Sequence, residues 1–488
     1  MTPKFAYVLN YFRQIYNVPQ AVEIGYGTTD RKVNIYDCQT RYFESLNPFP
    51  GNNITIKNWR NREIPFLFAK QDQGDVVGFS DNRAFIRYDI LAASFFFLSG
   101  WQEFEFMSRH NILRYPYNAS LQKKLNITQI PVVNYYFDIL KTAIERVYNL
   151  SLSISAWGEN SSAICLTHDI DKCYTGWRQD VFSQVKKKRL ATAAKIVRRR
   201  ATHSDYWFNF TDILDIEEQY SAQSSFYFIG SKNKLYTKPQ YAIPEQQKIS
   251  PQREKITDRD YFFQASPLSR FNGYTTFLQN ADYDIRTREI QSVFEEIRQH
   301  GSEVGIHGGF GSHLDASLLK TEAGRFPFPI TGGRFHYLNF DMTCTFDILE
   351  SLGLSYDSTL GFAEKSGFRN GIAFPFLPYN IREDRPYPLL EIPLIAMDTT
   401  FRRYQYSAMA EILPEVLTIF NEVEKFNGCL TILWHNAYFS PYKFAGWKDI
   451  YENILQEGKR RNAALFSGEQ VYERWEKYIE LMRCNVES

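Results

Sequence analysis

The sequence predicts an α/β protein in which an N-terminal α/β or α+β domain precedes a (β/α) barrel. Three observations support this fold class. The chain has 488 residues, which is enough for more than one domain. From about Ser161, apolar strands alternate with amphipathic helices, as is typical of parallel βαβ units. Hydrophobic residues make up 44% and aromatic residues 16% of the chain, as expected for an ordered globular protein.

The N-terminal domain is predicted over residues 1–125. Its strand-like runs are KVNIYD, IPFLFA and GDVVGFS. They precede one helical stretch, RYDILAASFFFLSGWQEF, whose apolar residues form a face at helical spacing. A second helix, within IPVVNYYFDILKTAIERVYNL, should end near Leu150 and form part of a helical linker over 126–160.

The barrel domain is predicted over 161–475, with a C-terminal tail over 476–488. Two insertions interrupt it, at about 174–204 and 232–281. The first contains KKKRLATAAKIVRRR, which predicts a basic helix that is either a solvated face or a patch for phosphate or membrane. The second is polar and contains prolines, and we expect it either to fold over the site or to mediate oligomerisation.

Charge and cysteine content limit the partners and the compartment. The 56 Lys and Arg nearly balance the 55 Asp and Glu, so the chain as a whole is not expected to bind nucleic acid. The six cysteines form no CxxC pair, which favours a reducing compartment. No run approaches the roughly 18 apolar residues of a transmembrane segment, and we expect a cytoplasmic protein.

The stretch SSAICLTHDIDKC ends an apolar strand with two acids. Residues at i and i+2 of a strand share a face, so Asp169 and Asp171 point to one side and His168 and Ile170 to the other. Adjacent carboxylates repel one another unless a cation or a proton lies between them. The motif therefore predicts a cation site, the alternative being a helix N-cap beside a surface acid.

Histidines follow other apolar strands, in GSEVGIHGGFGSHLD, GGRFHYLNF and CLTILWHN. With the first motif, these hold five of the eight histidines: His168, His307, His313, His336 and His435. Neutral imidazole is a common zinc ligand beside a carboxylate, and three protein ligands leave a position open for water. Arg334, in GGRFHYLNF, is suited to hold a carboxylate bidentately.

Over about residues 160–475 the order of these motifs resembles the polysaccharide deacetylases, the NodB-like carbohydrate esterases of family four. The family's TFDDG or TFDxD motif corresponds to THDID at 167–171, and SSFYFIG is similar to its ATFFV strand. HxxxH matches at His307, with Gly311 in place of the second histidine. RxPY matches RFHY, with histidine for proline, and LLHD matches LWHN, with asparagine for the acid.

This resemblance implies a distorted (β/α) barrel of the polysaccharide deacetylase type and a metal-dependent hydrolase that removes N-acetyl groups. The expected substrate is an acetylated amino sugar or glycan. The expected cytoplasmic location adds the hypothesis that the protein acts in surface polysaccharide biosynthesis. The expected cofactor is a divalent metal, zinc in the first place, and no nucleotide cofactor is indicated.

The resemblance also implies residue roles. Asp169 would be the catalytic base, oriented by Arg334, and a backbone N–H near Tyr337 would stabilise the oxyanion. Asp171 and His307 would bind the metal. The third protein ligand would be His313 or His336, or there would be none. His435 would protonate the leaving amine. The remaining candidates are supporting residues: Asp357 or Asp398 to orient His435, and His168.

Two other functions fit the sequence. One is a catalytically silent carbohydrate-binding protein on the same fold, favoured by the missing HxxxH partner and the altered RxPY motif. The other is a glycosidase with paired carboxylates, which would place acids on different strands around a groove and leave His307 and His435 without a role. The sequence makes no prediction of the oligomeric state.

Overall fold

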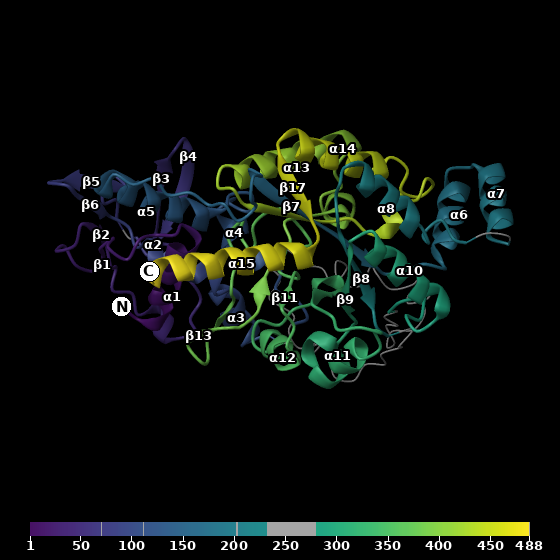
Figure 1. Ribbon diagram of the computed structural model, residues 1–488, viewed down its shortest axis with the longest axis horizontal. Helices are drawn as coiled ribbons and strands as arrows, with labels where there is room; N and C mark the ends of the chain where they lie inside the picture. The colour runs from purple at the N-terminus through teal and green to yellow at the C-terminus, as the bar shows by residue number, and fades with distance from the viewer. Residues whose placement is uncertain (70, 111, 202–203, 232–279, 488) are drawn as a thin grey trace, which may run out of the picture.

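The computed structural model describes residues 1–69, 71–110, 112–201, 204–231 and 280–487. The predicted insertion over 232–281 therefore lies outside the described residues, apart from its last two positions. The molecule is elongated, with the N-terminal region at one end, a two-helix projection at the other and a large sheet between them (Figure 1). Among the described residues, every helix is too short or too polar to cross a membrane.

The N-terminal region starts with α1 (Pro3–Ile15) and contains two small sheets. One has the strand order β1-β2-β6-β5, and the other is the antiparallel hairpin β3–β4. Each predicted strand-like run overlaps one strand: β2, β4 and β5. The elements are β1 (Ile24–Tyr26), β2 (Val33–Ile35), η1 (Tyr42–Glu44), β3 (Ile54–Trp59), β4 (Arg62–Leu67), β5 (Val77–Ser80) and β6 (Arg83–Ile86).

The predicted single helical stretch is two helices, α2 (Ile90–Leu98) and α3 (Trp101–Met107). Gly100 separates them with φ of +61°, a conformation that glycine adopts at little cost. Asp89 caps α2 by accepting the Ala92 N–H. All 9 residues of α2 are buried, so α2 is a central helix and not a surface helix with one apolar face.

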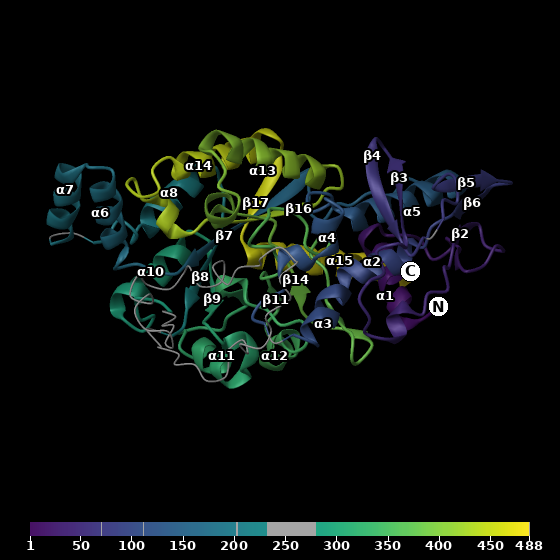
Figure 2. The same cartoon turned by 180° about the vertical axis from the view of Figure 1, so that it is seen from behind.

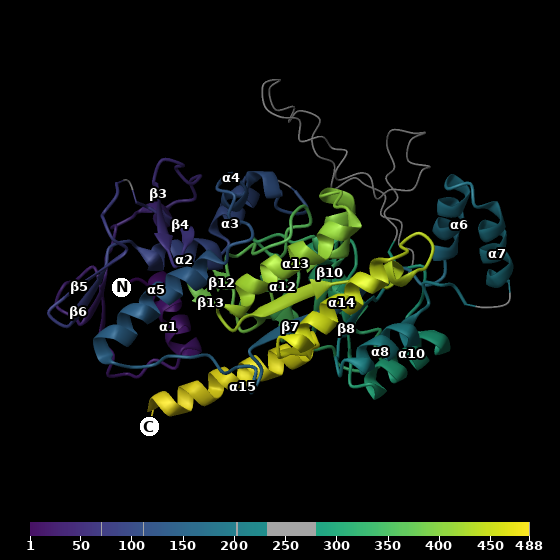
Figure 3. The same ribbon diagram turned by 90° about the horizontal axis from the view of Figure 1, so that it is seen from above.

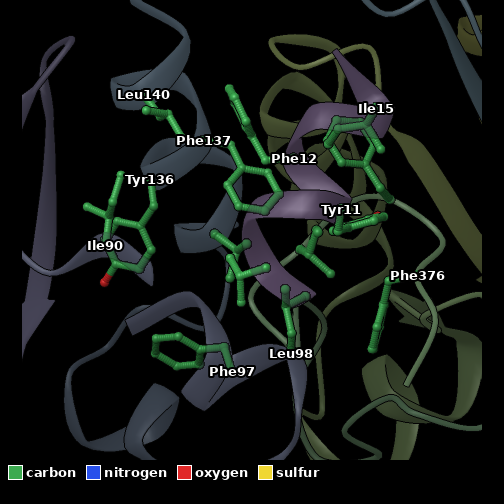
Figure 4. Packing of buried hydrophobic residues seen from close by; sticks show 14 of the residues in the cluster. Tyr11, Phe12, Ile15, Ile90, Phe97, Leu98, Tyr136, Phe137, Leu140 and Phe376 are labelled. Atoms are coloured by element: carbon green, nitrogen blue, oxygen red, sulfur yellow. The ribbon is translucent and has the colours of Figure 1, made fainter. Parts of the chain in front are cut away.

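The helix predicted before Leu150 is α5 (Val132–Tyr148), which follows η2 (Tyr117–Ala119) and α4 (Leu121–Lys124). It packs with α1 and α2 through aromatic side chains (Figure 4). The ring centroids of Phe12 and Phe137 lie 5.5 Å apart in an edge-to-face arrangement. The Tyr11 hydroxyl donates to the Pro375 carbonyl at 2.6 Å, so this core continues into the C-terminal part of the chain.

The large sheet has the order β14-β11-β10-β9-β8-β7-β16-β15, and β17 also pairs with β7. All of these pairings are parallel, as predicted from the alternation of strands and helices. The result is a mixed α/β structure with a parallel half-barrel sheet. The strands are β7 (Ser162–Ile170), β8 (Ser225–Ile229), β9 (Glu303–Gly308), β10 (Gly332–Phe335), β11 (Tyr356–Asp357), β14 (Leu390–Glu391), β15 (Ala396–Met397), β16 (Cys429–Leu433) and β17 (Ala463–Phe466).

One short segment connects the two edges of this sheet. After β14, the Leu394 N–H donates to the Leu360 carbonyl at 3.2 Å, and the next N–H, of Ile395, donates to Thr431 at 3.0 Å. The chain thus crosses from the β11 side to the β16 side within a few residues. A small hairpin of β12 (Tyr379–Asn380) and β13 (Arg385–Pro386) precedes this segment.

Helices surround the large sheet (Figures 1 and 2). They are α8 (Phe210–Gln219), α10 (Arg288–Gln299), α11 (Ala316–Ala323), α12 (Thr345–Leu352), α13 (Met409–Glu424), α14 (Trp447–Arg460) and α15 (Gly468–Glu487). α15 continues through position 476, where we predicted a tail to begin. It reaches the N-terminal region, where the Tyr478 hydroxyl donates to the Ile15 carbonyl at 2.7 Å.

The first predicted insertion is the two-helix projection, formed by α6 (Gly176–Lys186) and α7 (Leu190–Arg200) (Figure 3). The predicted basic helix over 186–200 corresponds to α7, but it begins at Leu190 and not at Lys186. The chain turns between the two helices, where Lys188 has φ of +59°. Lys186 is the last residue of α6, Lys187 and Lys188 lie in this turn, and the basic stretch is helical again from Leu190.

A buried ion pair joins the N-terminal region to the large sheet. Glu103 of α3 accepts hydrogen bonds from the guanidinium of Arg369, including one of 3.0 Å from Nε. Both side chains are almost fully buried, at 2% and 0% exposure. The pair is therefore largely protected from solvent screening.

We expect Glu103→Gln to destabilise the protein by about 3–5 kcal/mol, because it leaves the Arg369 guanidinium buried without a counter-charge. Thermal unfolding should show a clear fall in Tm. The double substitution Glu103→Met with Arg369→Leu should recover most of it. As a control, Glu23→Gln removes an exposed ion pair and should leave Tm unchanged. An unchanged Tm for Glu103→Gln would contradict the role assigned to this pair.

Candidate metal centre and active site

Seven ionisable side chains meet where the parallel strands of the large sheet end. They come from β7, β9, β10 and the ends of β15 and β16: Asp169, Asp171, His307, Arg334, His336, Asp398 and His435. The register places Arg334 opposite His307 on neighbouring strands. Because all of these strands are parallel, their carboxyl ends lie at one edge of the sheet, where barrel enzymes carry their catalytic groups.

Asp171, His307 and His336 form a group whose ligand atoms all lie within 4.8 Å of one another. Asp171 Oδ1 is 3.5 Å from His307 Nε2 and 3.2 Å from His336 Nδ1. The two ring nitrogens are 2.9 Å apart. The group offers two nitrogen donors and one oxygen donor, and such a set suits zinc and other first-row divalent ions.

The surroundings of this group fit a metal ion. His307 Nδ1 lies 2.9 Å from the Arg334 carbonyl, which can only accept. The proton is therefore on Nδ1, and Nε2 presents its lone pair to the group, as in metal-bound histidines. Asp171 Oδ1 is buried and has no hydrogen-bond partner among the described residues. A bound cation would satisfy this oxygen.

The pKa shifts of Asp171 and His336 also favour metal binding by this group. Burial alone would raise the pKa of Asp171, yet His336, His307 and His435 hold it well below the usual range. Burial lowers the pKa of His336, and the neighbouring Asp171 only partly opposes this. A carboxylate and a neutral imidazole are the protonation states that bind metals. The Asp171 side chain remains 34% exposed, so the group is accessible from outside.

Three candidate residues lie apart from this group. His313 is fully buried, neither ring nitrogen has a hydrogen-bond partner among the described residues, and burial lowers its pKa to about 3. His168 points to the other face of β7, where its ring nitrogens meet the Trp434 carbonyl and Glu217. Asp357 accepts from the Thr359 N–H and hydroxyl, and burial raises its pKa to about 6.

Asp169 lies beside the metal-ligand group and is held by Arg334. Asp169 Oδ2 is 3.6 Å from His307 Nε2, and Asp169 Oδ1 accepts from Arg334 Nη1 at 3.0 Å. The pair is not bidentate, because the other guanidinium N–H groups donate to Thr167 and to Ser358. The buried guanidinium therefore fixes the orientation of the Asp169 carboxylate.

On the other side of the group, His435 pairs with Asp398. His435 Nδ1 lies 2.9 Å from Asp398 Oδ1, and the His435 backbone N–H donates to Asp398 Oδ2 at 2.5 Å. Burial lowers the pKa of His435, but Asp398 and Asp171 more than offset this and raise it to about 9. Its Nε2 faces Asp171 Oδ2 at 4.0 Å. The structure thus pairs His435 with Asp398, and not with Asp357.

A strained turn follows His336. Tyr337 and Leu338 have φ of +61° and +53°, which is unusual for residues other than glycine. Arg114, from the N-terminal region, donates to the Tyr337 carbonyl at 2.9 Å and pairs with Glu364 at 3.0 Å. This contact braces the backbone next to His336. No local pattern in the sequence predicts this contact, because Arg114 and Tyr337 are 223 positions apart.

A second bracing segment contains Asp282 and Tyr283. The Asp282 carboxylate accepts the backbone N–H groups of Cys173, Tyr174 and Thr175, at 2.7–3.1 Å. The neighbouring Tyr283 hydroxyl contacts the Ile170 carbonyl. These bonds fix the chain on both sides of Asp171. The sequence signal for Asp282 was only an acid beside an insertion, and we did not single it out.

A further group of potential ligands lies in the N-terminal region and consists of Asp37, Cys38 and Asp89. Here Asp89 already accepts hydrogen bonds from the Ala92 N–H, the Tyr26 hydroxyl and Cys38. These partners account for its carboxylate without a cation. We therefore assign the candidate metal centre to the large sheet.

Comparisons with known proteins cover the chain unevenly. Residues 2–149 match the model of a protein family of unknown function, DUF7033. No curated protein matches the chain. The structure is similar to that of a Mycobacterium smegmatis protein provisionally assigned as a polysaccharide deacetylase, with 12% identity and a TM-score of 0.38, over 66% of this chain and 92% of that chain. We draw no argument from a similarity of that size and infer the function from the side chains of the site.

We expect the purified protein to bind about one zinc or similar ion per chain. His336→Leu should weaken metal affinity by more than about 100-fold, because changes outside the ligand set already cost about 10–100-fold. His313→Leu is the matched control, since it removes a buried imidazole outside the ligand group. Elemental analysis and chelator competition measure both. Retained affinity in His336→Leu, or equal loss in His313→Leu, would contradict the ligand assignment.

Proposed function

We propose that this protein is a metal-dependent hydrolase that removes N-acetyl groups from an amino sugar or glycan. One observation carries the proposal: a two-histidine, one-carboxylate ligand group has a carboxylate fixed by Arg334 on one side and a charged histidine on the other. The substrate class comes from the resemblance of the motif order to the polysaccharide deacetylases.

Asp169 is the proposed general base. A divalent cation bound by Asp171, His307 and His336 would polarise the acetyl carbonyl and lower the pKa of a water molecule. Asp169 would take a proton from such a water, because its Oδ2 lies beside the ligand group, 3.6 Å from His307 Nε2. Arg334 fixes the orientation of this carboxylate through the hydrogen bond to Asp169 Oδ1.

His435 is the proposed general acid. Its pKa of about 9 keeps the ring protonated at neutral pH, and Asp398 holds its Nδ1 so that Nε2 points toward the ligand group. The proton on Nε2 passes to the nitrogen of the amide as the C–N bond breaks. We expect the Tyr337 N–H to donate to the oxyanion, from a turn whose geometry Arg114 supports.

This arrangement favours a deacetylase over the two other functions considered. A glycosidase needs two carboxyl groups on opposite sides of a glycosidic bond, whereas Asp169 and Asp171 both face His307. A silent binding protein has no use for a complete ligand group. The HxxxH motif lacks its second histidine at Gly311, but His336 of the neighbouring strand end offers a third donor in its place.

We expect Asp169→Asn to lower kcat by about 10²–10⁴-fold, the usual contribution of a general base. Metal binding should be retained, because Asp169 is not in the ligand group. The assay is acetate release from acetylated chitooligosaccharides by the metal-loaded protein. Full activity in Asp169→Asn would rule out this base. A metal-loaded native protein that binds such saccharides without releasing acetate would favour the silent binding protein.

The pH dependence of kcat tests His435 and Asp398. Activity should fall at high pH as His435 loses its proton, at or below pH 9, because the pKa is raised to about 9 and a bound cation would lower it. In Asp398→Asn the burial that lowers this pKa remains, while the carboxylate that raises it is gone. The alkaline limb should therefore move by at least about one unit to lower pH. If the alkaline limb of the kcat profile of Asp398→Asn stays at the same pH or moves to higher pH, His435 is not the general acid.

A further inference from the structure

The α6–α7 hairpin carries a charge unlike that of the rest of the chain. Positions 176–200 contain nine Lys or Arg and one Asp, whereas the whole chain has a formal net charge of +1. Residues 185–191, which include the turn between the helices, are all exposed. The hairpin projects from one end of the molecule, away from the N-terminal region (Figures 1 and 3).

The hairpin also exposes large apolar side chains among these cations. Of the ten large hydrophobic residues exposed in the described part of the chain, four lie here: Phe182, Val185, Leu190 and Val197. Phe182 is 70% and Leu190 65% exposed. On α6, Phe182 and Val185 are about one turn apart and share a face, as do Leu190 and Val197 on α7, two turns apart.

The packing of the hairpin does not account for these side chains. Between them the two helices bury only small or polar residues and one isoleucine: Gly176, Asp180, Gln184, Ala193 and Ile196. Because Phe182 and Leu190 are exposed to water, they contribute little hydrophobic stabilisation to the hairpin. Insertion of these two side chains into an apolar environment outside the protein would gain this hydrophobic free energy.

The base of the hairpin is fixed beside the candidate active site. Asp180 of α6 accepts the Ser440 hydroxyl at 2.9 Å and the Lys443 N–H at 3.1 Å, in the loop that follows His435. The Trp177 N–H donates to Asp205 at 2.9 Å. The hairpin also begins a few residues after Asp171, in the loop that Asp282 holds. It is therefore anchored to two strand-end loops of the site.

Positive charge continues from the hairpin to the edge of the site. The pKa of Lys443 is lowered to about 8, first by burial and then by Arg402 and Arg403, with Lys172 also contributing. Lys443 lies over the ring of Phe444 at 4.7 Å, and Arg402 lies over the same ring at 4.6 Å. A cluster of cations therefore lies beside the loop that follows His435, to which α6 is anchored.

We propose that the α6–α7 hairpin docks the protein onto an anionic phospholipid bilayer. Its lysines and arginines bind the headgroup phosphates, and Phe182 and Leu190 enter the interfacial region below them. Basic residues combined with exposed Phe and Leu are the composition of segments that lie in the membrane interface. A nucleic acid would satisfy the cations but not the aliphatic side chains. The inference does not depend on the proposed deacetylase activity.

Vesicle co-sedimentation of the full chain tests the proposal, using phosphatidylcholine vesicles with and without phosphatidylglycerol. We expect binding only to the anionic vesicles, and weaker binding at high salt. Each basic residue at such a surface strengthens binding about fivefold, so Lys186→Ser, Lys187→Ser and Lys188→Ser together should weaken it about 100-fold. Phe182→Ser with Leu190→Ser should weaken it at least about tenfold. Ile56→Ser, a change of an exposed residue at the opposite end of the molecule, should have no effect.

Insertion has a separate readout. In Phe182→Trp, the added indole should shift its emission to the blue on anionic vesicles and be quenched by brominated lipid. Circular dichroism should show that each variant is folded. The proposal is overturned if the native chain does not bind anionic vesicles, if both multiple variants bind like the native chain, or if the Phe182→Trp emission does not change. A different outcome would assign the hairpin to nucleic acid instead. In that case the native chain binds a single-stranded oligonucleotide but no vesicles, and the lysine variant loses the oligonucleotide binding.

Discussion

The compensation of two neighbouring carboxylates is the constraint on which the site depends. Asp169 and Asp171 approach the same His307 nitrogen, at 3.6 and 3.5 Å, in surroundings that penalise uncompensated charge. The structure compensates the two acids in different ways. Arg334 compensates Asp169, whereas Asp171 faces two imidazoles and has one buried oxygen without a hydrogen-bond partner among the described residues. This difference assigns the two roles. Asp169, which has a permanent counter-charge in Arg334, is placed to accept a proton, and Asp171, which lacks one, is placed to bind a cation.

The scaffold fixes these side chains from several directions. Parallel strands bring the side chains to one edge of the sheet, but the loops beyond the strand ends need separate support. The Asp282 carboxylate holds the loop that follows Asp171, and Arg114 holds the strained turn after His336. Arg114 belongs to the region that matches a family of unknown function. That region therefore has a physical connection to the candidate site, in addition to the buried pair of Glu103 and Arg369.

Local sequence rules predicted the parts of the structure that depend on local geometry. The i, i+2 rule correctly placed Asp169 and Asp171 on one face of β7 and His168 on the other, and alternating strands and helices predicted the parallel sheet. The rules failed where tertiary contacts or turns decide. A single predicted helix is split at Gly100, and the predicted basic helix begins only after a turn at Lys187 and Lys188. The choice between Asp357 and Asp398 depended on how β15 approaches β16. The third candidate ligand, His336 or His313, was left open for the same reason: only the folded chain shows that His336, just after β10, lies beside Asp171.

X-ray absorption at the zinc edge tests the ligand set most directly. In the zinc-loaded native chain, we expect low-atomic-number ligands at about 2.0–2.2 Å, with outer-shell scattering from two imidazole rings. His336→Leu, loaded at a zinc concentration that overcomes its weaker affinity, should show scattering from one ring, and His313→Leu should still show two. Scattering from two rings in His336→Leu, or from one ring in the native chain, would contradict the assignment of Asp171, His307 and His336 as the metal centre.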